Sequence, residues 1–304
     1  MMNKRRVGSS DLYVSELSLG CMSLSPKLGN ENEKIVKTAL EKGINYFDTA
    51  DLYGFGWNEE FIGKTLKDVR HDIILATKGG NEWNQSKDSW NWNPSKKYIK
   101  SALKHSLQRL QTDYIDLYQL HGGTIDDPMD ETIEAFEELV SEGLVRYYGI
   151  SSIRPNTIKY YAEHSNIQSV MMQYSLLDRR PEELFSYLSS KNISVVARGP
   201  VAKGWLSEKA FSKNPEEDYL SHRGSDIQEK LAEAKMFIQN KSTIHTALQF
   251  VLSHPVVATA VAGASSVEQL SENIEALSAP PLTEDMIKQL DSLFPAEIYE
   301  THRA

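Results

Sequence analysis

The stretch INYFD at residues 44–48 is a short β-rich apolar run that ends in an ionisable side chain. It lies between two longer amphipathic stretches, at 31–42 and 58–68, whose apolar residues recur with a helical period. A short apolar run between two amphipathic helices is typical of βα repetition.

The same unit recurs along the chain as far as the C-terminal region. Seven further β-rich runs occupy residues 16–20, 72–78, 114–121, 144–151, 168–175, 193–199 and 256–263. The helical patterns that alternate with the runs occupy residues 31–42, 58–68, 95–110, 129–142, 155–164, 181–190, 242–253 and 267–277. Eight βα units with right-handed crossovers close naturally into a ring, so the sequence predicts an α/β fold, the (β/α)8 TIM barrel.

Three segments lie outside this eightfold pattern. Residues 4–16 predict an N-terminal β-hairpin, residues 203–241 a long charged connection, and residues 283–294 extra helical structure at the C-terminus. Loops as long as 203–241 are usually lids or binding loops. No boundary rich in Gly, Ser or Pro divides the chain, so we expect a single barrel domain over residues 1–304.

The composition excludes several classes of protein. With 33 Lys and Arg against 42 Asp and Glu, the formal charge is −9, which works against nucleic acid or an anionic membrane as partner. Cys21 is the single cysteine, so no intramolecular disulfide is possible, and no metal-ligand spacing occurs. There is no signal-peptide pattern and no apolar span of about 18 residues. We therefore expect a cytoplasmic protein.

Ionisable residues at the strand ends are the candidate catalytic groups, because a TIM barrel builds its active site there. Residues two apart on a strand share a face, so Asp48, Lys78 and His121 converge at the barrel mouth if those faces point inward. Tyr53 follows Asp48 closely enough to fold over the same mouth. A Lys ammonium favours phenolate, so we expect the pKa of Tyr53 to lie below its usual value of about 10.

These residues lie in blocks that resemble, in order, those of the aldo-keto reductase superfamily. The blocks GINYFDTADLYG (43–54), TKGG (77–80) and YIDLYQLHG (114–122) resemble those that carry the family's Asp-Tyr-Lys-His tetrad. Four further blocks resemble the cofactor-binding blocks of the family: GLVRYYGISS (143–152), MMQYSLLDR (171–179), VVARGPVAKGWLSEK (195–209) and AVAGASSVEQLSENIEA (260–276). The resemblance covers essentially the whole chain.

The resemblance implies hydride transfer from NADPH, with NADH possible, to a small-molecule aldehyde or ketone. Carried over by position, Tyr53 is the implied general acid, Lys78 and Asp48 tune its acidity, and His121 orients the carbonyl. The implied cofactor-binding residues are Gly20, Cys21, Met22, Asp48, Ser151, Ser152, Gln173, Arg198, Gly199, Pro200, Val201, Lys203, Gly204, Gly263, Ser265, Ser266, Gln269 and Asn273.

The chain departs from the family pattern at two places. Arg198 stands where many relatives have an aromatic residue that stacks on the nicotinamide. Ser265 and Ser266 stand where many have a Lys or Arg for the 2′-phosphate of NADP, which leaves Lys203 and Arg223 as candidate cations.

Aromatic residues near the predicted mouth are candidates for a substrate pocket, with loop packing or an oligomer contact as the alternative. They are Trp57, Trp83, Trp90 and Trp92; the alternative concerns the last three, in the loop 79–93, whereas Trp57, near Tyr53, is the better pocket candidate by position. Two other functions stay open, a Schiff-base aldolase that uses Lys78 and a cofactor-sensing regulatory subunit of a larger complex. The oligomeric state is also left open.

Overall fold

A closed barrel of eight parallel strands forms the centre of the protein, whose computed structural model describes residues 2–238 and 241–303. In chain order its strands are β3 (Leu17–Gly20), β4 (Tyr46–Asp48), β5 (Ile74–Gly79), β8 (Ile115–Leu120), β9 (Val145–Ser151), β10 (Ser169–Gln173), β11 (Ser194–Arg198) and β12 (Val257–Ala262). Each strand pairs with the next one along the chain, and β12 closes the ring by pairing with β3, for example Ala260 with Leu17. The predicted TIM barrel is confirmed, and every predicted run supplies one strand.

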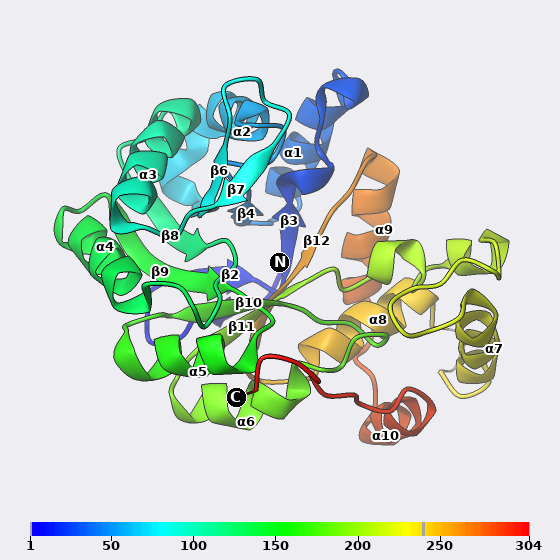
Figure 1. Cartoon of the computed structure of the whole chain (residues 1–304). Coiled ribbons are helices and arrows are strands. Elements are labelled where there is room, and N and C mark those ends of the chain that lie inside the picture. The colour runs from blue at the N-terminus through cyan, green and yellow to red at the C-terminus, as the bar shows by residue number, and fades with distance from the viewer. Residues whose placement is uncertain (1, 239–240, 304) are drawn as a thin grey trace.

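Helices cover the outside of the barrel (Figure 1). They are α1 (Glu31–Glu41), α2 (Trp57–Leu66), α3 (Lys96–Leu110), α4 (Met129–Ser141), α5 (Pro155–His164), α6 (Glu182–Ser190), α8 (Thr243–Leu252) and α9 (Val267–Ser278). Their apolar faces form a core around the barrel, with Ile62, Leu103 and Phe136 among its buried members. None of these helices, nor any other in the described part of the chain, has the length and apolar character that crossing a membrane requires.

A second, smaller core fills the barrel interior, where inward-facing side chains such as Leu117, Met171 and Val196 meet. The N-terminal hairpin, β1 (Lys4–Arg6) and β2 (Tyr13–Ser15), is antiparallel as predicted, and Val14 packs into this same core. The hairpin therefore closes one end of the barrel and leaves the other end for a site.

Two predicted connections carry structure that the sequence reasoning did not identify. Residues 203–241 contain α7 (Gly224–Lys235), and the predicted C-terminal helix, α10 (Glu284–Leu293), lies beside it (Figure 1). Ile227, Leu231 and Ala234 share the buried face of α7, a helical spacing hidden in a charged segment. Residues 239 and 240 of this segment lie outside the described residues. The loop after β5 forms a second hairpin, β6 (Asn81–Trp83) and β7 (Trp90–Trp92).

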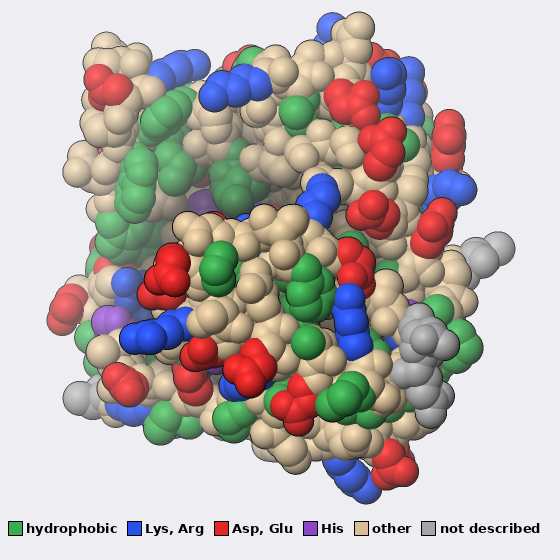
Figure 2. Space-filling model, turned by 90° about the vertical axis from the view of Figure 1, so that its right-hand side faces the viewer, with side chains coloured by type: hydrophobic (Ala, Val, Ile, Leu, Met, Phe, Trp, Pro, Cys, Tyr) green, Lys and Arg blue, Asp and Glu red, His purple; other side chains and the backbone are tan. Residues whose placement is uncertain are grey.

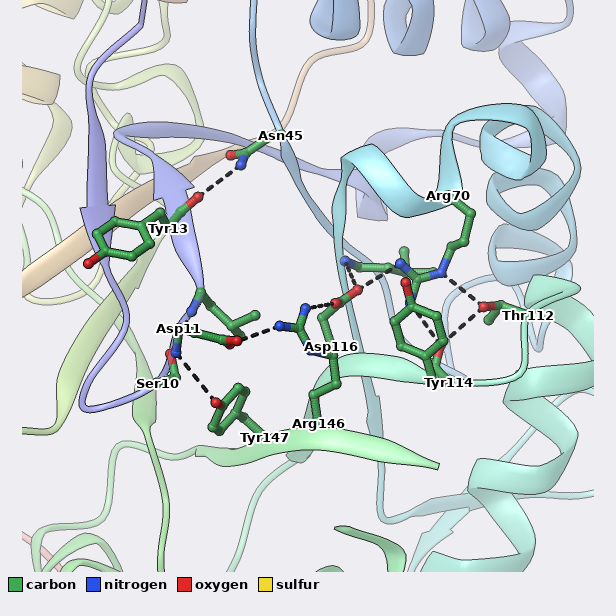
Figure 3. Close-up of polar contacts among 12 residues, drawn as sticks. Ser10, Asp11, Tyr13, Asn45, Arg70, Thr112, Tyr114, Asp116, Arg146 and Tyr147 are labelled. Atoms are coloured by element: carbon green, nitrogen blue, oxygen red, sulfur yellow. Dashed lines mark hydrogen bonds and ion pairs between the residues drawn. The ribbon is translucent and has the colours of Figure 1, made fainter. Parts of the chain in front are cut away.

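An ion cluster centred on a buried aspartate joins several elements near the hairpin end of the barrel (Figure 3). Asp116 on β8 is only 1% exposed and pairs with Arg70 at 2.7 Å and with Arg146 of β9 at 2.6 Å. It also accepts the backbone N–H of Leu75 on β5, and Arg146 reaches Asp11 in the hairpin turn. One carboxylate therefore ties its own strand, β8, to both neighbouring strands, β5 and β9, and, through Arg146, to the hairpin.

Helices α2 and α3 approach each other closely at Gly63, where a Cβ atom would lie 2.5 Å from the backbone of Leu110. Backbone atoms cannot rotate aside as a side chain does, so we expect Gly63→Ala to lower the free energy of unfolding by about 1–3 kcal/mol, although alanine has the higher helix propensity. Urea unfolding beside Lys64→Ala, an exposed neighbour on the same helix, measures this. A Gly63→Ala protein as stable as Lys64→Ala would contradict the close contact.

Candidate active site

A cavity of about 830 Å³ opens where the barrel strands end. Each of the eight strands contributes a residue at or just after its C-terminal end: Gly20, Asp48, Lys78, His121, Ser151, Gln173, Arg198 and Gly263. Figure 2 shows a hollow in the molecular surface with basic and histidine side chains visible inside it. A cavity of this size can hold a cofactor-sized ligand.

The four side chains predicted to be catalytic meet in this cavity. The Lys78 ammonium donates hydrogen bonds to Asp48 Oδ1 at 2.5 Å and to Tyr53 Oη at 3.3 Å. The rings of Tyr53 and His121 meet edge to face, with their centroids 5.9 Å apart. Asp48 and Lys78 are buried, whereas Tyr53 and His121 are partly exposed.

Tyr53 reaches the other three because the loop after β4 folds back along β5. Thr49 N donates to Ala76 O, so the pairing of β4 with β5 continues past Asp48, and Asp51 N then donates to Lys78 O. Thr49 O in turn accepts a hydrogen bond from Lys78 Nζ at 2.7 Å. The loop therefore follows the strand that carries Lys78, which brings the phenol onto the ammonium.

Lys78, in its pair with Asp48, is held in the charged ammonium form. Burial disfavours the ammonium, but the nearby Asp48 and Tyr53 oxygens outweigh it and raise the pKa of Lys78 above its usual value. Burial also raises the pKa of Asp48, which Lys78 only partly counteracts. Lys78 is therefore a fixed cation next to the Tyr53 hydroxyl.

The expected lowering of the Tyr53 pKa is wrong. Burial raises the pKa of Tyr53 above its usual value by more than the Lys78 charge lowers it, and the Asp48 charge adds to the rise. The expectation considered the neighbouring cation without the loss of water around the phenol. Tyr53 is consequently a neutral phenol at neutral pH and carries a proton that it can donate.

His121 is neutral in this environment. Burial lowers the pKa of His121 to about 3, and the Lys78 and Arg198 charges act in the same direction. Its backbone is fixed by His121 N donating to Gly79 O and by Asn81 Nδ2 donating to His121 O. The ring atom Nδ1 is buried and has no hydrogen-bond partner among the described residues. A neutral imidazole keeps one N–H to offer to a ligand oxygen.

Most of the predicted cofactor residues lie on the cavity wall. They are Gly20, Met22, Asp48, Ser151, Gln173, Arg198, Gly199, Val201, Lys203, Gly204, Gly263, Ser265, Gln269 and Asn273. Four others, Cys21, Ser152, Pro200 and Ser266, are absent from the described lining. Cys21 is fully buried, and Ser266 is the N-cap of α9, accepting from Gln269 N.

A chain of three polar side chains links the barrel to the segment 203–241. Arg198 donates to Gln173 Oε1 at 2.8 Å, and Gln173 Nε2 donates to Tyr219 Oη at 3.2 Å. Tyr219 was not predicted, because it lies far from any strand end in a stretch without a recognisable period. It brings the long segment onto the cavity.

Further cavity residues were also missed, among them Ser207, Lys209 and Glu272. Ser207 and Lys209 fall inside the block 195–209, so that block carried a signal that strand-end reasoning did not use. Arg223, a candidate cation, is not part of the described lining and precedes α7 as its N-cap residue.

The four tryptophans lie outside the described lining of the cavity. Trp57 stacks on Phe61, Trp83 lies near Arg109, and Trp92 Nε1 donates to Asp127 Oδ1. Trp90 is exposed. The contacts of Trp83 and Trp92 match the loop-packing alternative, and a pocket role for the tryptophans stays a prediction.

Comparison with known proteins gives consistent matches. The family model described as "Aldo/keto reductase family" matches residues 16–294. "Uncharacterized oxidoreductase YqkF" of Bacillus subtilis is 54% identical, with 100% of both chains covered. The holo form of aldo-keto reductase AKR11C1 from Bacillus halodurans is 55% identical with a TM-score of 0.95, and the apo form gives 51% and 0.86, each with 100% of both chains covered.

Proposed function

Because the chain belongs to the aldo/keto reductase family and is an NAD(P)H-dependent oxidoreductase, we propose that it reduces an aldehyde or ketone to an alcohol with NADPH, Tyr53 being the proton donor. The observation that carries this proposal is the hydrogen-bonded series Asp48–Lys78–Tyr53, which ends on a neutral phenol at a cavity. The proton, the group that stabilises its loss and the space for a ligand are then at one place.

The chemistry divides between the cofactor and four side chains. When bound, the nicotinamide supplies the hydride. Tyr53 Oη gives its proton to the carbonyl oxygen, and the Lys78 ammonium at 3.3 Å stabilises the phenolate that remains. Asp48 holds Lys78 in place, and the N–H of neutral His121 orients the carbonyl by donating a hydrogen bond to its oxygen.

The cavity residues fit a nicotinamide dinucleotide with a 2′-phosphate. Ser265 N and Oγ both donate to Gln269 Oε1, so these groups already have a partner. Lys203 and Lys209 line the cavity, and neither ammonium makes an ion pair with any residue that the structure describes. Two unpaired cations suit a phosphate, and they offset Glu272 on the same wall.

A paired titration with NADPH and NADH, followed by tryptophan fluorescence at fixed salt, tests the cofactor. We expect NADPH to bind at least about tenfold more tightly than NADH, since one charge-assisted hydrogen bond contributes about 1.5–3 kcal/mol. Lys209→Ala should weaken the binding of NADPH by about tenfold and leave the binding of NADH nearly unchanged. Lys104→Ala, which removes the same charge from an exposed surface position, is the control.

Each other outcome has a definite meaning. Equal binding of both cofactors points to an NAD-tolerant dehydrogenase and removes the phosphate role of Lys209. If neither cofactor binds, or if NADPH binds but no aldehyde or ketone stimulates its oxidation, the reductase proposal fails. Slow turnover with tight cofactor binding and a stable protein partner would instead favour the regulatory subunit.

A Schiff-base aldolase fits the geometry poorly. The nucleophile of such an enzyme is a neutral amine. Lys78 is fully buried, its Nζ has three oxygen partners, and its pKa is raised by the Asp48 and Tyr53 oxygens in spite of burial. An amine held in this way keeps the proton that it would have to lose.

A further inference from the structure

Gln119 is a polar side chain in the interior of the barrel, one step deeper along β8 than His121. Residues 117, 119 and 121 share the inward face of this strand because side chains alternate. Gln119 pairs in register with Lys78 on β5, so the two lie side by side on neighbouring strands. It is fully buried, and the core beneath it includes Leu117 and its partner on β5, Ala76.

Gln119 contacts the half of the Asp48 carboxylate that Lys78 does not. Lys78 Nζ donates to Asp48 Oδ1, and Gln119 Nε2 donates to Asp48 Oδ2 at 3.3 Å. A carboxylate only accepts hydrogen bonds, so the amide must turn its NH2 group toward it. Asp48 is only 3% exposed, and the described residues provide no other side-chain donor to Oδ2.

The other end of the same amide has no partner. Gln119 Oε1 is buried and accepts no hydrogen bond from any described residue. An unpaired buried acceptor destabilises a fold, so packing alone favours methionine or leucine at this position. A residue that lowers stability at a site is expected where it serves activity. The contact that Gln119 does make is with Asp48.

We propose that Gln119 is a positioning residue that keeps the Asp48 carboxylate charged and directed at Lys78, and so acts on Tyr53 through these two groups. Its effect on turnover rests on the proposed reductase function, whereas its effect on Asp48 does not. Gln119 is not part of the described cavity lining, and its hydrogen bond goes to Asp48 and not to the Tyr53 hydroxyl.

The charge balance around Asp48 supports this role. Burial raises the pKa of Asp48, while the Lys78 charge and the hydrogen bonds from Lys78 and Gln119 lower it. The titratable groups that face Asp48 are Cys21, Tyr46, Tyr53, Lys78 and Arg198. Only the two cations among them favour the carboxylate. Burial favours the protonated acid, so the hydrogen bond from the neutral Gln119 amide is a needed further contribution in favour of the carboxylate.

Two substitutions test the proposal, and they are expected to impair the enzyme at opposite ends of the pH range. Gln119→Met keeps the length of the side chain but has no N–H, so Asp48 should protonate at a higher pH. Gln119→Glu has nearly the same shape but donates only while its own carboxyl is protonated, so it should resemble the wild type at low pH and fail as that carboxyl ionises. Thr259→Val, at a buried barrel residue that hydrogen-bonds to Ser18 and not to Asp48, is the control.

The readouts are a ¹³C NMR titration of the Asp48 carboxyl, assigned by its loss in Asp48→Asn, and the pH profile of kcat. For Gln119→Met we expect the Asp48 midpoint and the acid limb of the profile to rise together by about 1 pH unit. For Gln119→Glu we expect kcat relative to wild type to fall as the pH rises. Cofactor affinity should stay unchanged in both variants.

The proposal would be overturned if both Gln119 variants had the same Asp48 midpoint and the same pH profile of kcat as wild type and Thr259→Val. A loss of kcat that is equal at every pH with an unchanged Asp48 midpoint would also overturn it, because that is the mark of a packing role. If the wild type reduces no carbonyl, the proposed function has failed, and the NMR titration still decides the action of Gln119 on Asp48. Thermal melts establish whether each variant is folded. If Gln119→Met does not fold, the Gln119→Glu variant alone decides the test.

Discussion

Replacing Tyr53 by phenylalanine is expected to lower kcat by about 10²- to 10⁴-fold, the usual contribution of a general acid. The change removes the hydroxyl that lies 3.3 Å from Lys78 Nζ and keeps the ring that meets His121 edge to face. The proton for the carbonyl oxygen is lost while the shape of the cavity is kept. Steady-state kinetics with NADPH and an aldehyde measure kcat, and fluorescence titration should give a nearly unchanged cofactor affinity.

Tyr161→Phe is the matched control, because it removes one hydroxyl from a fully buried tyrosine on α5, away from the cavity lining. It should leave kcat unchanged. Equal turnover by Tyr53→Phe and wild type would remove Tyr53 as the proton donor. A loss of both turnover and cofactor binding would show instead that the substitution disturbs the site as a whole.

Asp116→Ala is expected to cause the largest loss of stability among the changes considered, about 3–5 kcal/mol of the free energy of unfolding. The aspartate is buried between Arg70, whose side chain is 9% exposed, and Arg146, and its removal leaves a buried guanidinium without its counter-charge. Urea unfolding with linear extrapolation measures the loss. Folded protein should keep its kcat, because the cluster lies at the opposite end of the barrel from the cavity.

Asp285→Ala is the control for this substitution. It breaks an ion pair with Lys288 in which the aspartate side chain is 87% exposed, so the loss should be within about 1 kcal/mol. A loss for Asp116→Ala no larger than that of the control would mean that water or a shift of the arginines replaces the missing charge.

The sequence was enough to predict the barrel and the convergence of four side chains at its mouth, for one physical reason. Strand alternation has a period of two and active sites of barrels lie at strand ends, so Asp48, Lys78 and His121 could be brought together without coordinates. Tyr53 followed from its short distance along the chain. These predictions needed only local periodicity and one rule of topology.

What the sequence reasoning missed depends on contacts between distant parts of the chain. The path of 203–241 is set by packing such as that of Gly224, where a Cβ would lie 2.6 Å from Glu217 O and 2.8 Å from Trp205. No local pattern therefore pointed to Tyr219 on the cavity wall, and Lys209, although it lies within the block 195–209, is too far from a strand end for the strand-end rule to select it. The predicted direction of the Tyr53 pKa shift was wrong for a related reason, because burial is a property of the whole fold.

The pairing of β12 with β3 has a consequence for the synthesis of this protein. Leu17 meets Ala260 in that pairing, and the cavity takes Gly20 from one of these strands and Gly263 from just after the other. The ring therefore stays open on the ribosome until β12 has emerged. A nascent chain that lacks β12 has no complete cavity, so a ligand that binds there can stabilise the closed barrel but cannot guide the early steps of its folding.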